Sequence, residues 1–167
     1  CRNPGINLVQ YIDEINAELD HLCTLTFSDE ELGYLASLRY IKSDYIAFLT
    51  MFRLQRKYVN VVAMNENEID VKIKGPWLHT IPFEIYVLSI VNEIYFRHNS
   101  GDKQACVIEG NKRLDAKIAL LKNTPDIEGL RFSDFGTRRR FSREWQEHVV
   151  TRLKNEVPSY FTGTSNV

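Results

Sequence analysis

Residues 129–142 read GLRFSDFGTRRRFS, which is the part of the chain most informative about function. A short apolar strand over residues 129–133 breaks at a glycine turn, passes three successive arginines and enters a helix near Ser142. The helix is predicted to continue to about Glu156, and a second strand follows at residues 160–162. This order predicts a parallel βαβ unit, in which both strands end on the same side.

The turn after the first strand has the residue types of an anion-binding site. Phe135 offers a flat ring and Gly136 lets the backbone approach a ligand closely. Arg138, Arg139 and Arg140 place guanidiniums beside a helix start, which suits carboxylate or phosphate groups. Two alternatives stay open, because a phenylalanine after a strand also fits a core position and an exposed basic triplet also fits a solvated loop.

A second candidate loop follows the second strand. Thr164, Ser165 and Asn166 offer backbone donors and small polar side chains, which equally describes an ordinary turn. Because the strands are predicted to be parallel, we expect this loop to share one pocket with the arginine turn.

Composition limits the classes of function. The chain has 21 Lys and Arg against 22 Asp and Glu, so it has no general attraction for nucleic acid or an anionic membrane. Cys1, Cys23 and Cys106 are scattered without metal-ligand spacing, and the four histidines show none either, so no metal site is predicted. Scattered free cysteines fit a reducing cytoplasm. The longest apolar stretch, residues 81–96, is too short and too interrupted to span a bilayer and is predicted to be a buried helix.

The first two thirds of the chain mix helices with one hairpin. Helices are expected over the following segments: residues 6–23, a segment opened by a capping box at Ser28 and Glu31, a segment capped by Ser43 that runs to Phe52, residues 82–96, and a segment capped by Asp102. Residues 59–64 and 69–74 are rich in β-branched or alternating side chains, which predicts an antiparallel hairpin. We place the domain boundary near Asp126, with residues 1–125 before it and residues 126–167 after it.

The arginine motif carries a family resemblance. Residues 134–142, together with residues 145–146, 149–150 and 163–167, closely resemble nicotinate phosphoribosyltransferases, and so does the upstream stretch KGPWLH at residues 74–79. The resemblance extends over essentially the whole chain, in the right order and with compatible separations. It implies an α/β fold of the type II phosphoribosyltransferase class, in which an α+β N-terminal part precedes the first βαβ unit of an incomplete α/β barrel.

The resemblance also implies an activity. Such enzymes join nicotinate to phosphoribosyl pyrophosphate, giving nicotinate mononucleotide and pyrophosphate in NAD biosynthesis, with ATP hydrolysis coupled and magnesium accompanying the phosphates. It implies no tightly bound cofactor, and it is compatible with a homodimer in the full-length enzyme. Catalysis would rest on cationic clamps and on placement of the ring.

By this resemblance Phe135 stacks on the pyridine ring, and Arg138 holds the substrate carboxylate or the nucleotide phosphate. The resemblance assigns less definite roles to Arg139 and Arg140: one contacts phosphate or supports the residues that touch substrate, and the other points to solvent. Ser165 matches the position where nicotinamide-using relatives carry a carboxylate, and a neutral serine there avoids repelling nicotinate. Thr164 and Asn166 flank it.

Two features of the family have no counterpart here. The phosphorylated histidine follows the point where this sequence ends, and the aromatic-containing N-terminal segment precedes Cys1. We therefore expect a fragment without catalytic residues of its own, and an isolated chain that is inactive. The competing interpretations are a nicotinamide-using relative and, from another class, an RNA-binding module that uses the arginines.

Overall fold

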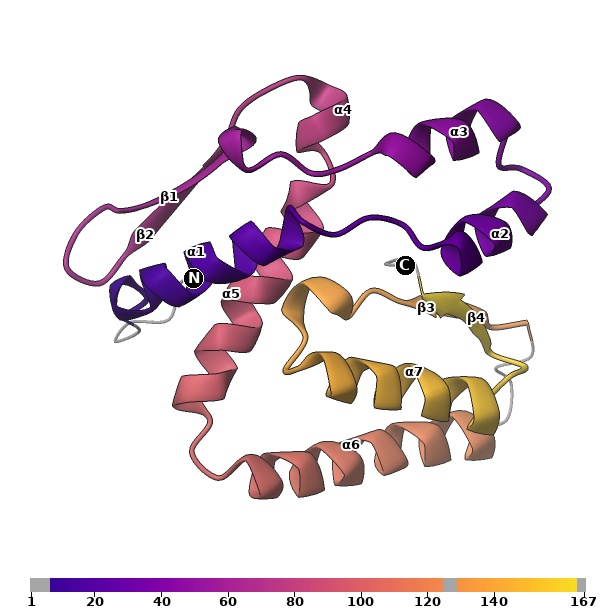
Figure 1. Cartoon of the computed structure of the whole chain (residues 1–167). Helices are drawn as coiled ribbons and strands as arrows, with labels where there is room; N and C mark the ends of the chain where they lie inside the picture. The colour runs from indigo at the N-terminus through magenta and orange to yellow at the C-terminus, as the bar shows by residue number, and fades with distance from the viewer. Residues whose placement is uncertain (1–6, 125–128, 165–167) are drawn as a thin grey trace. The chain divides into compact units, whose positions relative to one another are not determined.

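The computed structural model describes residues 7–124 and 129–164, and the chain forms two compact units, one ending at Glu84 and the other beginning at Ile85. The predicted fold class, α/β, is confirmed. The elements of the first unit are η1 (Val9–Tyr11), α1 (Ile12–Leu22), α2 (Asp29–Ser37), α3 (Ser43–Met51), η2 (Arg56–Tyr58), β1 (Val59–Ala63), β2 (Ile69–Ile73) and α4 (Trp77–Thr80) (Figure 1).

Local signals account for the start of α2 but not for the starts of α1 and α3. The capping box is present, since the Ser28 hydroxyl accepts the Glu31 amide at 3.2 Å and the Glu31 carboxylate accepts the Ser28 amide at 2.8 Å. The first helix starts later than expected because Asn7 accepts the amide of Val9 and a 3₁₀ turn precedes α1. The predicted cap at Ser43 is wrong, because Ser43 is the first helical residue and the N-cap position belongs to Lys42.

The hairpin forms as predicted. Strands β1 and β2 are antiparallel, with Val61 opposite Val71. Val59 and Val61 are buried, so the strand has one dry face. The tip is closed by Asn65, whose side-chain oxygen accepts two backbone amides of the loop.

The second unit is built from α5 (Phe83–Asn99), which starts at the boundary, and from α6 (Lys103–Asn123), β3 (Phe132–Asp134), η3 (Thr137–Arg139), α7 (Arg143–Glu156) and β4 (Phe161–Thr164). Figure 1 shows α6 and α7 running alongside each other, with the strand pair next to α7. Their shared core contains Leu114, Ile118, Leu153 and Val157. This core joins α6 to the βαβ unit, so the division at Glu84 differs from the boundary that the sequence placed near Asp126.

Helix α5 is less buried than its apolar sequence predicted. Val87 and Ile94 are buried, but Tyr86 and Leu88 keep 39% and 41% of their surface exposed. The prediction of a helix deep in a core is therefore correct for one face only. No helix within residues 7–124 and 129–164 combines the length and the apolarity needed to cross a membrane.

Candidate functional site

The predicted parallel pairing of β3 and β4 is present, and it places the carboxyl ends of the two strands next to each other. Asp134 at the end of β3 lies opposite Thr164 at the end of β4. Phe135 comes directly after β3 and is 62% exposed. Because a large aromatic side chain gains free energy from burial, so much exposure argues against a core role for Phe135.

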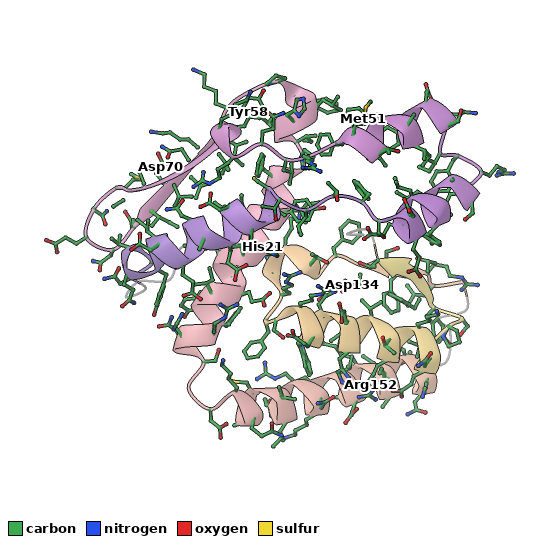
Figure 2. The ribbon with its side chains drawn as sticks, in the orientation of Figure 1. His21, Met51, Tyr58, Asp70, Asp134 and Arg152 are labelled. Atoms are coloured by element: carbon green, nitrogen blue, oxygen red, sulfur yellow. The ribbon has the colours of Figure 1, made fainter. Side chains whose placement is uncertain are left out.

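The carboxylate of Asp134, a residue labelled in Figure 2, connects the segments that form this edge. One of its oxygens, Oδ2, accepts the backbone N–H of Gly136 at 3.0 Å, the hydroxyl of Thr164 at 3.3 Å and the side-chain amide of Gln146. The donors come from the turn after β3, from β4 and from the first half of α7. A single side chain thus holds all three segments together.

Gly136 is required here for space. Its φ of −74° is available to any residue, but a Cβ would lie 2.5 Å from Gln146 Oε1 and 3.1 Å from Asp134 Oδ1. Gly136 is thus crowded by side chains of this chain, and the close approach of a ligand to its backbone stays a prediction.

The three arginines have different environments. Arg140 donates from Nε to Glu93 of α5 at 2.8 Å, and both side chains are mostly covered. The carbonyl of Arg138 accepts the side-chain amide of Asn92 at 3.0 Å, and the Arg138 residue is half-buried. Arg139 is exposed. Helix α5 thus anchors the arginine turn at two points.

The start of α7 carries its own negative charge. The Ser142 hydroxyl accepts the amide of Trp145 at 3.1 Å and caps the helix as predicted. A backbone hydrogen bond at Glu144 and the hydroxyl of Ser142 hold the pKa of that carboxyl below its usual value. An ionised Glu144 already complements the helix dipole, which weakens this helix start as a phosphate site.

A cavity of about 570 Å³ lies elsewhere in the second unit. It is lined by residues of α5 and α6 and by Phe141, and Phe135, Arg138 and Thr164 do not contribute to it. Ser165 and Asn166 lie outside the described residues. The substrate roles of the site residues and the shared pocket stay predictions.

The sequence interpretation missed the anchors of the site. Asn92 and Glu93 interrupt an apolar helix, which was a signal that two polar side chains needed partners. Gln146 gave a weaker signal, since it lies in the first turn of a helix, where a polar residue is ordinary.

Comparison with known proteins decides the family. The model of the nicotinate phosphoribosyltransferase N-terminal domain matches residues 1–92, which is more than half of the chain, and the nicotinate phosphoribosyltransferase family model matches residues 130–167. The chain belongs to the nicotinate phosphoribosyltransferase family. The resemblance of the arginine motif is thereby confirmed.

Individual members of the nicotinate phosphoribosyltransferase family are similar to this chain in sequence and in structure. The nicotinate phosphoribosyltransferases of Cupriavidus necator and Ralstonia nicotianae are 52% and 50% identical over all of this chain, which covers 42% and 43% of their lengths. The crystal structure of the Porphyromonas gingivalis enzyme superposes with a TM-score of 0.84 at 27% identity, over 99% of this chain and 41% of that one. For the Vibrio cholerae enzyme the TM-score is 0.80 at 27% identity, over 98% and 40%. The chain thus spans about two fifths of the length of these relatives.

Proposed function

We propose that the whole protein is a nicotinate phosphoribosyltransferase. It joins nicotinate to phosphoribosyl pyrophosphate and forms nicotinate mononucleotide and pyrophosphate, with ATP hydrolysis coupled to the transfer. The observation that carries this proposal is the identity of about half of all residues to relatives named for this activity, along the full length of the chain.

In this proposal the pyridine ring lies against Phe135. An exposed phenylalanine at the carboxyl end of a parallel strand has the position and the flat apolar face that a ring needs. Thr164 lies at the neighbouring strand end, opposite Asp134, and this position supports a role for Thr164 beside the ring.

Arg138 provides the positive charge that a carboxylate or phosphate requires. Of the three arginines, Arg138 follows Phe135 most closely along the chain, and Arg140, which pairs with Glu93 of α5, has a supporting part. Breaking the bond between the anomeric carbon and pyrophosphate develops negative charge on the leaving group, so a fixed cation nearby favours the transition state.

ATP and magnesium belong to the same proposal. Magnesium accompanies the phosphates of the substrates, and no residue of this chain is assigned to it. A cytoplasmic location and a homodimer complete the proposal, and light scattering of the purified whole protein measures the oligomeric state.

The test is turnover of labelled nicotinate by the whole protein in the presence of phosphoribosyl pyrophosphate, ATP and magnesium. We expect nicotinate mononucleotide as product, and we expect an equal concentration of nicotinamide to compete poorly. Absence of both turnover and saturable nicotinate binding contradicts the proposal, and efficient use of nicotinamide would favour the nicotinamide-using class instead.

A matched pair of arginine variants tests the site. Arg138→Ala should raise the KM for nicotinate about tenfold or more, because a charge-assisted hydrogen bond contributes about 1.5–3 kcal/mol. Arg131→Ala removes an exposed arginine whose guanidinium donates to the carbonyl of Leu130, and it should leave KM within about twofold of the wild-type value. Equal effects of the two variants would remove Arg138 from the site.

A further inference from the structure

We infer that Asp134 is a positioning residue of the nicotinate site, an inference that rests on the proposed function. Its carboxylate fixes the turn that carries Phe135 and ties this turn to the end of β4. It acts through these two segments and needs no contact with substrate.

The geometry makes an ionised carboxylate the suitable group. Oδ2 accepts from Gly136 N at 3.0 Å, from Thr164 Oγ1 at 3.3 Å and from the Gln146 amide. A carboxylate has about four acceptor sites on its two oxygens, and its charge strengthens each bond. An asparagine keeps only one oxygen in this position, without the charge.

Phe135 is held from both sides by this arrangement. It lies between Asp134, which belongs to β3, and Gly136, whose amide is bonded to the Asp134 carboxylate. Two fixed neighbours leave the backbone of Phe135 little freedom, so the direction of its Cα–Cβ bond follows from the Asp134 bond. A turn that is ordered before substrate arrives lowers the entropy cost of binding.

The same packing leaves no room for a looser turn. A Cβ on Gly136 would lie 2.5 Å from Oε1 of the Gln146 amide, which is closer than van der Waals contact allows. The backbone of the turn is therefore packed directly against the Gln146 amide and the Asp134 carboxylate. The single proton of the Thr164 hydroxyl is shared between the backbone oxygen and Oδ2 of Asp134, which both lie 3.3 Å from the hydroxyl oxygen, so both contacts link the end of β4 to the same residue. Displacing any one of these groups therefore displaces the turn.

The chain offers a matched control on the same two strands, one residue before Asp134 on β3 and two residues before Thr164 on β4. Ser133 and Thr162 join their hydroxyl groups at 2.8 Å across β3 and β4, and both residues are exposed. Ser133→Ala removes a hydrogen bond between these strands without touching the turn. It separates loss of strand pairing from loss of positioning.

The experiment measures steady-state constants for Asp134→Ala, Asp134→Asn and Ser133→Ala in the whole protein. We expect the KM for nicotinate to rise about tenfold or more in Asp134→Ala and by less in Asp134→Asn, since small displacements of bound groups are costly. The KM for ATP should stay within about twofold in both variants, and Ser133→Ala should change neither constant beyond that range.

Three results would overturn the inference: an unchanged nicotinate KM in active Asp134→Ala, an equal rise in Ser133→Ala, or an equal rise in the KM for ATP. If Asp134→Ala does not fold, Gly136→Ala takes its place, because the added methyl group pushes the Gln146 amide away and should give the same pattern. A wild-type protein without turnover overturns the proposed function and this inference with it, whereas an active wild type with unaffected variants overturns the inference alone.

Discussion

The ion pair between Glu93 and Arg140 should stabilise the second unit measurably. A double-mutant cycle of Glu93→Ala and Arg140→Ala isolates the coupling between the two side chains. The cycle is best made in a Trp77→Phe background, because the chain contains two tryptophans and Trp145 of α7 then reports on the second unit alone.

The expected coupling follows from distance and burial. Arg140 Nε lies 2.8 Å from Glu93 Oε2, and the two side chains are 23% and 19% exposed. Exposed pairs contribute about 0.2–1 kcal/mol and hydrogen bonds to charged groups about 1.5–3 kcal/mol, so we expect about 1.5 kcal/mol for this partly buried pair. Glu93→Ala should cost more than Arg140→Ala, because Glu93 also lies 3.9 Å from Arg97 and its loss leaves two guanidiniums facing each other.

The assay is urea unfolding followed by Trp145 fluorescence for the four proteins of the cycle. The control is a second cycle on Arg143 and Glu147 of α7, which meet at the same 2.8 Å but are 72% and 62% exposed. We expect about 0.3 kcal/mol there, the value of an exposed helical pair. If the first coupling is no larger than the second, burial does not strengthen the pair and the anchoring role of α5 is refuted.

Two further predictions concern α6 and α2. Gly110→Ala should destabilise the second unit by about 1–3 kcal/mol, because the new Cβ would lie 2.7 Å from the ring of Trp145. Gly33→Ala should stabilise α2 by about 0.4–1 kcal/mol, because nothing lies within 4 Å of its new Cβ. Thermal unfolding by circular dichroism measures both changes in stability, and changes of the same sign would contradict the packing argument. The hydrogen bonds with Ser28 hold the pKa of Glu31 below its ordinary value of 4.5, so the stabilisation of α2 is present above that value and is lost as pH falls through the lower, folded-state pKa. Glu31→Gln should keep the cap and lose this acid dependence, which amide exchange at Ser28 measures; exchange with the wild-type acid dependence would contradict it.

Local signals in the sequence predicted the elements that depend on nearby residues. The capping box at Ser28 and the cap at Asp102 need partners within three positions, and both form. The alternation over residues 69–74 predicted β2 for the same reason, since side-chain direction in a strand follows from the backbone alone.

Local sequence signals could not predict contacts between residues that are far apart along the chain. Glu93 and Arg140 are separated by 47 positions, and Asp134 and Thr164 by 30, so no local pattern connects them. The partial exposure of α5 was missed for a related reason, because an apolar sequence favours burial but does not supply the elements that cover each face.

Family, order of helices and strands, and the parallel βαβ unit could all be predicted from residue patterns, because motifs, caps and periodicity act over a few residues. Packing was needed to show which arginine pairs with α5, why Gly136 has no room for a side chain, and which carboxylate joins the two strand ends. These depend on atoms brought within hydrogen-bonding distance by packing, and such distances exist only once the chain has folded.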